Sequence, residues 1–74
     1  MDASIRHEEL PEYRQIVEWF WKSPKIDIDD LHSVLDALAE KRECATDPFV
    51  VRELSEMFDQ TLMEIELRTH DMRA

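Results

Sequence analysis

Residues 47–70 have the sequence DPFVVRELSEMFDQTLMEIELRTH, which predicts the longest helix of the chain. Asp47 is of a type that caps helices through its side chain, and Pro48 suits the first helical position, where no amide donor is needed. Apolar side chains at helical spacing then form one broad face: Val50, Val51, Leu54, Met57, Phe58, Leu62 and Ile65. The opposite side also carries apolar residues: Phe49, Met63 and Leu67. Such a helix is either central in a bundle or shared with a partner.

Two proline-containing pairs divide the rest of the chain. Ser23-Pro24 and Asp47-Pro48 interrupt the helical pattern, because proline lacks an amide donor and disfavours the helical conformation in the residue before it. The chain of 74 residues contains no glycine, and tight β-hairpins usually require one. We therefore expect three helices, over residues 11–22, 28–43 and 48–70, with frayed termini.

The first two expected helices each carry one apolar stripe at helical spacing. The stripe of the first consists of Leu10, Tyr13, Ile16, Val17 and Phe20. The stripe of the second consists of Ile28, Leu31, Val34, Leu35 and Leu38. Asp27 or Asp29 can cap the second helix. These patterns predict an all-α single domain over residues 1–74, with a short first helix packed on an antiparallel hairpin of the other two helices.

The small size of the domain favours self-association. A chain of this length buries only about 60% of its unfolded surface and is often marginally stable without disulfides, metals or a partner. The single cysteine, Cys44, has no partner for an internal disulfide or a cysteine-type zinc site, so we expect a reducing, cytoplasmic location. A two-fold homodimer is the simplest expectation.

The charge balance excludes several partners. With 18 acidic and 9 basic residues, the net charge is −9, which argues against direct binding to nucleic acid. No apolar run is long enough for a membrane span, and no secretion signal is apparent at the start of the chain. We expect neither nucleic acid nor membrane as a binding partner.

No motif indicates catalysis, and we expect no enzyme, cofactor or metal site. The absence of glycine removes phosphate-binding loops and dinucleotide motifs. The three histidines (His7, His32 and His70) are dispersed along the chain, and Asp27, Asp29 and Asp30 are better explained as helix-capping residues than as calcium ligands. A domain this small also has little volume for a substrate pocket. A small catalytic or metal-dependent protein is a third hypothesis.

The surplus apolar residues predict an interface. Trp19, Phe20 and Trp21 are consecutive, so they cannot all face one core, and tryptophan is common in interface anchors. An edge tryptophan lying over the core explains them equally well. The candidate interface consists of Trp19, Trp21, Phe49, Met63 and Leu67, with an acidic rim of Glu53, Glu56 and Glu64.

Two functions follow from this surface. The first is a small acidic regulatory or adaptor protein that binds another protein, such as a basic or regulatory one, through an apolar helical face with acidic residues around it. The alternative is a mimic of nucleic acid, in which spread carboxylates imitate a phosphate backbone and occupy a nucleic-acid-binding protein. The two differ in salt dependence, because exposed charges are screened at high salt.

Overall fold

The computed structural model describes residues 5–73, with side chains described up to residue 70. A 3₁₀ turn, η1, spans His7–Glu9. Three α-helices follow: α1 over Leu10–Lys22, α2 over Ile28–Cys44 and α3 over Pro48–Arg73. Within residues 5–73 no strand is present. The structure confirms the predicted all-α, three-helix class.

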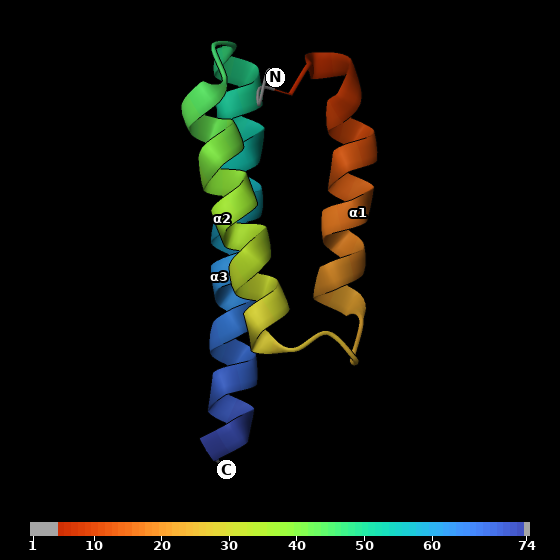
Figure 1. Ribbon diagram of the computed structural model, residues 1–74, viewed down its shortest axis with the longest axis vertical. Helices are drawn as coiled ribbons and strands as arrows, with labels where there is room; N and C mark the ends of the chain where they lie inside the picture. Colours follow the sequence, from red (N-terminus) through yellow and green to blue (C-terminus); the bar gives the residue numbers. More distant parts are fainter. Residues whose placement is uncertain (1–4, 74) are drawn as a thin grey trace.

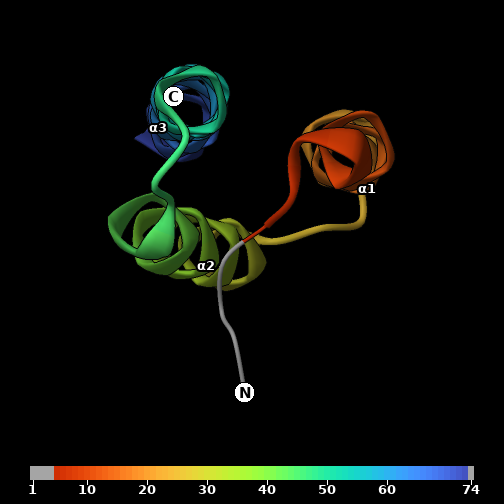
Figure 2. The ribbon, with the colours of Figure 1, turned by 90° about the horizontal axis from the view of Figure 1, so that it is seen from above.

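The helices alternate in direction. α1 descends from the N-terminal end, α2 returns, and α3 descends behind α2 (Figure 1). Seen from above, the three helices occupy the corners of a triangle (Figure 2). α2 and α3 share the most extensive contacts, and α1 packs more lightly on both. The fold is therefore the expected helical hairpin with a shorter first helix against it.

Aspartate side chains define the start of α2 and α3. Asp27 Oδ1 accepts a hydrogen bond from the Asp30 amide at 3.0 Å, and Asp47 Oδ1 accepts one from the Phe49 amide at 2.9 Å. Each carboxylate satisfies an amide that has no partner within its own helix and lies at the positive end of the helix dipole. Of the two capping candidates for α2, Asp27 is the one used.

The helices end without a left-handed residue. No residue in the described range has a positive φ. Ser23, which follows α1, and Ala45, which follows α2, are both extended. Glycine-based caps would satisfy the last carbonyl groups of these helices in many proteins, and this chain contains no glycine. The carbonyls at the end of α1 instead accept hydrogen bonds from the side chain of Arg68.

The core consists of two clusters of buried side chains. The larger is formed by Ile5, Leu10, Val17, Val34, Leu38, Val50, Leu54 and Met57. The smaller contains Leu31, Leu35 and Ile65. Phe20, Trp21 and Phe58 are partly buried and pack against both clusters, so these aromatic rings join them. The core therefore runs along the length of the helices and is not a single central cluster.

Two residues expected in the core are exposed. Ile16 is 55% exposed and Leu62 is 41% exposed. Each directly adjoins a buried residue, Val17 and Thr61 respectively, and therefore points about 100° away from it around the helix. A helix in a three-helix bundle buries only the arc that faces its neighbours. The helical spacing predicts Ile16 in the apolar stripe of the first helix and Leu62 in the broad apolar face of the third, and the structure shows that neither residue is buried.

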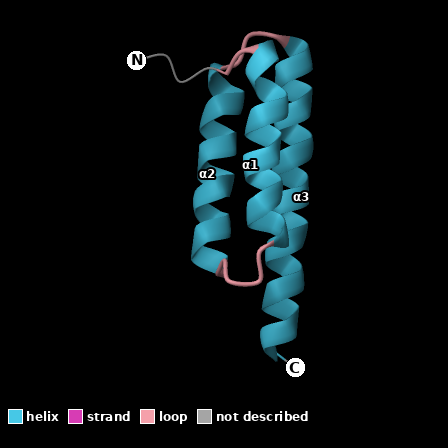
Figure 3. Cartoon of the chain, turned by 90° about the vertical axis from the view of Figure 1, so that its right-hand side faces the viewer, coloured by secondary structure: helices cyan, strands magenta, loops and turns pink. Residues whose placement is uncertain are grey.

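α3 extends beyond the rest of the bundle. It has 26 residues against 17 in α2, so it is about 39 Å long where α2 is about 26 Å. Its C-terminal turns continue past the α1–α2 connection (Figure 3). The molecule is accordingly elongated, with extents of 42 × 21 × 18 Å.

None of the helices in the described range has the combination of length and apolar character that a membrane span requires.

Candidate functional site

Trp21 occupies an internal position. Its side chain is partly buried between the two core clusters, and its Nε1–H donates to Thr61 Oγ1 at 2.8 Å. The Thr61 hydroxyl donates in turn to the Met57 carbonyl at 2.8 Å and is fully buried. The structure therefore places Trp21 in the contact between α1 and α3, whereas the sequence grouped it with the candidate interface.

Arg68 holds the connection between α1 and α2. Its Nη2 donates to the Trp21 carbonyl at 3.1 Å and to the Ser23 carbonyl at 3.2 Å, and its Nη1 donates to the Ile26 carbonyl. The guanidinium thus caps the end of α1 and adds a positive charge at the negative end of the helix dipole. This side chain does what a glycine-based cap would otherwise do.

Thr61 and Arg68 were not predicted as functional residues, although the sequence contains a signal for both. Leu54, Met57, Thr61, Ile65 and Arg68 follow one another at spacings of three or four residues, which places them on one side of α3. A polar residue in such a buried series needs a hydrogen-bond partner. The spacing predicts burial, but the partners come from elsewhere in the fold and cannot be read from it.

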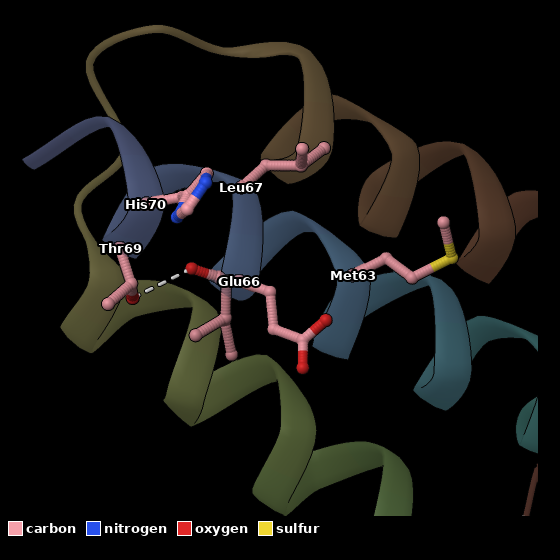
Figure 4. Close-up of a pocket in the computed structure, with 6 residues that line it drawn as sticks. Met63, Glu66, Leu67, Thr69 and His70 are labelled. Carbon is pink, nitrogen blue, oxygen red and sulfur yellow. Dashed lines mark hydrogen bonds between the residues drawn. The ribbon is translucent and has the colours of Figure 1, made fainter. Parts of the chain in front are cut away.

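Met63 and Leu67 form the exposed apolar part of α3. Met63 is 54% exposed and Leu67 is 59% exposed, and they lie one helical turn apart. Together with His70 they line an open hollow of about 530 Å³ along the C-terminal half of α3. In Figure 4, Leu67 and Met63 project from the side of α3 that is turned away from α2, where the ribbon of α1 is also drawn. We call Met63 and Leu67, with the carboxylates around them, the α3 surface.

The charged side chains of α3 that precede Leu67 in this half of the helix are all negative. Every charged side chain between Glu53 and Leu67 is a carboxylate: Glu53, Glu56, Asp59, Glu64 and Glu66. Asp59 and Glu66 lie one turn from Met63, and Glu64 lies one turn from Leu67. Glu56 is partly paired, because Arg52 Nε lies 3.8 Å from its Oε1. The predicted rim residues Glu53, Glu56 and Glu64 thus share α3 with two further carboxylates.

Ile16 and Trp19 form a second exposed apolar area, on α1, which we call the α1 surface. Trp19 is 59% exposed and packs edge-on against Phe20, with ring centroids 5.3 Å apart. It follows the buried Val17 by two residues, so it points about 200° around the helix and away from the bundle. The structure therefore distributes the predicted interface residues over more than one helix.

The α1 surface borders a hollow between α1 and α2. Ile16 lines this hollow of about 190 Å³ together with Glu12, Tyr13 and Lys41. Lys41 Nζ lies 5.4 Å from the centroid of the Tyr13 ring, in a cation–π arrangement. Burial raises the pKa of the Tyr13 phenol. The hollow beside the α1 surface thus has a basic side chain, Lys41, in its lining.

No family model, curated protein or solved structure matches the chain.

Phe49 lies at the opposite end of α3 from Leu67. It is 47% exposed, and its ring meets the His7 ring edge-on, with centroids 4.5 Å apart. It lines a hollow of about 260 Å³ between α1 and α3 that also includes Arg14. Phe49 is therefore partly covered within the chain and is set apart from Met63 and Leu67.

The remaining candidates for chemistry are dispersed. Cys44 is exposed at the end of α2. His7, His32 and His70 are exposed and lie on three different helical elements. Within the described part of the chain, no group of three or more His, Cys, Asp or Glu side chains is placed to hold a metal ion.

Proposed function

We propose that this chain is a non-enzymatic regulatory or adaptor protein that binds a basic, amphipathic protein segment on the α3 surface. One observation carries the proposal. Met63 and Leu67 are 54% and 59% exposed within a stretch of α3 whose charged side chains are all carboxylates. Large apolar side chains grouped in this way often mark a contact with another protein.

The chemistry of the α3 surface defines the kind of segment that fits it. Covering Met63 and Leu67 removes apolar area from water, which contributes about 25 cal/mol per Å². The carboxylates at Asp59, Glu64 and Glu66 attract Lys and Arg side chains beside the apolar contact. A helix with an apolar stripe flanked by basic residues meets both requirements. The negative net charge of the chain also speeds the encounter with such a segment.

The α3 surface is built on a preorganised helix. Arg68, one residue after Leu67, donates to three carbonyl groups of the α1–α2 connection. Thr69 Oγ1 donates to the Ile65 carbonyl at 2.9 Å, as the dashed line in Figure 4 indicates. A surface that is already ordered requires less conformational entropy to be lost on binding.

The test uses two synthetic peptides with the same leucine stripe, one flanked by lysine and the other by glutamate. We expect the chain to bind the lysine peptide and not the glutamate peptide, as measured by calorimetry. Leu67→Asp should weaken binding of the lysine peptide at least about tenfold, since it places a charge in the apolar contact. Leu62→Asp is the matched control on α3, because Leu62 is also exposed but lies on another side of the helix.

Equal binding by wild type and Leu67→Asp would contradict the α3 surface as the binding site, provided that both variants keep the helical circular dichroism of the wild type. A pull-down from native lysate with the same pair of variants would then identify the cellular partner. A genuine partner should be retained by Leu62→Asp and lost by Leu67→Asp.

Mimicry of nucleic acid is the second candidate. It is favoured by the segment from Glu53 to Glu66, which contains five carboxylates and no basic residue. In that case, charge carries the binding, and affinity should fall steeply between about 0.1 and 0.5 M salt. Glu64→Gln combined with Glu66→Gln should then matter more than Leu67→Asp. Apolar docking predicts the reverse order, with substantial binding left at high salt.

A further inference from the structure

The two exposed apolar surfaces differ in the charges around them. On the α1 surface, Glu12 lies one turn before Ile16, and Lys22 lies one turn after Trp19. Both charged side chains are exposed. Glu18 is engaged within α1, since its Oε1 lies 3.6 Å from Arg14 Nε. Among the exposed side chains of α1 itself, the charge beside this surface is therefore negative at the N-terminal end and positive at the C-terminal end, while Lys41 of α2 lines the hollow beside Ile16.

We propose that the α1 surface binds the α1 surface of a second copy of this chain, with the two helices antiparallel about a two-fold axis. In this arrangement Trp19 of each copy packs on Ile16 of the other. Glu12 of each copy then faces Lys22 of the other, so opposite charges meet at both ends. A closed two-fold contact requires a surface that complements itself, and the order of charges along α1 meets that requirement.

The hollow beside Ile16 adds a second feature that fits this occupant. Its volume is about 190 Å³, and it is lined by Glu12, Tyr13 and Lys41 as well as Ile16. In the antiparallel pairing, Trp19 of the second copy lies over Ile16, at the edge of this hollow. Tryptophan carries a large apolar ring with one N–H donor, and Glu12 offers an acceptor at the rim.

The α3 surface does not suit a second copy. Its carboxylates would face identical carboxylates, and like charges brought together oppose association. The self-association proposed for α1 is independent of the basic partner proposed for α3, because the two use different helices. A failure of one proposal would leave the other standing.

Sedimentation equilibrium from about 10 µM to about 1 mM tests the dimer, since a contact on a helix of 13 residues is small and the association is weak. We expect the average mass to rise with concentration toward that of a dimer. Trp19→Asp should weaken the association at least about tenfold. Leu67→Asp, the matched control with the same 59% exposure, should leave it unchanged. A wild type that stays monomeric throughout overturns the proposal, as does a dimer that survives Trp19→Asp.

Charge exchange tests the antiparallel arrangement. Glu12→Lys alone and Lys22→Glu alone should each weaken the dimer several-fold, because each places like charges at both ends. An equimolar mixture of the two variants should restore association, since opposite charges then meet again. Circular dichroism shows whether each variant remains helical. If neither single variant weakens the dimer, or if the mixture restores nothing, the proposed pairing is wrong.

Discussion

Arg68 is the residue that most tightly joins distant parts of the chain. It lies on α3, yet its three hydrogen bonds end on carbonyls of residues 21, 23 and 26. A planar guanidinium with several fixed donors suits a group of carbonyls that point toward one place. The α1–α2 connection can therefore end one helix and begin the next without glycine.

Replacing Arg68 should destabilise the fold. Hydrogen bonds to charged groups contribute about 1.5–3 kcal/mol, so we expect Arg68→Met to lower the free energy of unfolding by about 2 kcal/mol. Arg68→Lys should recover less than half of this loss, because an ammonium cannot reproduce the planar donor arrangement. Urea unfolding followed by circular dichroism measures both values. Full recovery by lysine would mean that positive charge alone stabilises the connection.

Tyr13 should make stability depend on alkaline pH. Burial raises the pKa of its phenol, so the folded state favours the protonated form. The contribution is fully present below about pH 10, the ordinary tyrosine value, and is lost as pH rises from there through the folded-state pKa, because the unfolded chain loses its proton first.

We therefore expect the unfolding temperature of the wild type to fall more than that of Tyr13→Phe as pH rises from about 9 to about 11. The chain has one tyrosine, and absorbance titration of tyrosinate therefore reports on this phenol alone. Parallel curves for the two proteins would show that the phenol has the same pKa in the folded and unfolded states.

Among the elements, α3 carries the most separate roles. One side supplies core residues such as Leu54 and Met57, and the same side supplies the polar anchors Thr61 and Arg68. The other side carries Met63 and Leu67. Because α3 is longer than α2, its C-terminal turns keep exposed surface that the hairpin cannot cover. Met63 and Leu67 are exposed because the helical period turns them away from the buried side of α3, which at the same level carries Ile65.

The start of α3 should depend on its aspartate cap. We expect Asp47→Ala to lower the free energy of unfolding by about 1 kcal/mol, since the Phe49 amide loses its acceptor. Asp47→Asn should be nearly neutral, because asparagine caps helices about as well as aspartate. Chemical denaturation of the three proteins gives the comparison. Equal losses for alanine and asparagine would show that the carboxylate charge, rather than the hydrogen bond, matters at this position.

On the scale of the whole molecule, the hairpin and α1 should differ in local stability. α2 and α3 share most of the tertiary contacts, while α1 is held mainly by the core residues Leu10 and Val17 and by the links from Trp21 to Thr61 and Arg68. Elements with fewer buried contacts open more readily. α1 also carries the surface proposed to bind a second copy.

Amide hydrogen exchange should show this difference directly. We expect the amides in the centre of α1 to exchange at least about tenfold faster than those in the centres of α2 and α3. Thr61→Val, which removes the acceptor of the Trp21 indole, should widen the gap. Exchange should be measured on a dilute sample, so that self-association does not protect α1. Uniform exchange across the three helices would mean that the bundle opens only as one unit.

The all-α class and the approximate helix positions follow from the amino-acid sequence alone. Pro24 and Pro48 exclude continuous helix, the absence of glycine disfavours hairpins, and the aspartates mark two helix starts, all through short-range constraints on the backbone. The exposed positions of Trp19, Met63 and Leu67 were also expected, because the helical period alone turns them away from the main apolar stripes.

Which edge residues are covered and which polar groups meet depends on how the helices pack together. The helical period cannot tell how wide an arc the neighbouring helices bury, so Ile16 and Leu62 were misplaced, while Trp21 acquired a partner 40 residues away. Arg68 likewise acts on carbonyls brought to it by the packing of α1 against α3. These contacts depend on how three helices are placed in space, and local spacing along the chain does not contain that information.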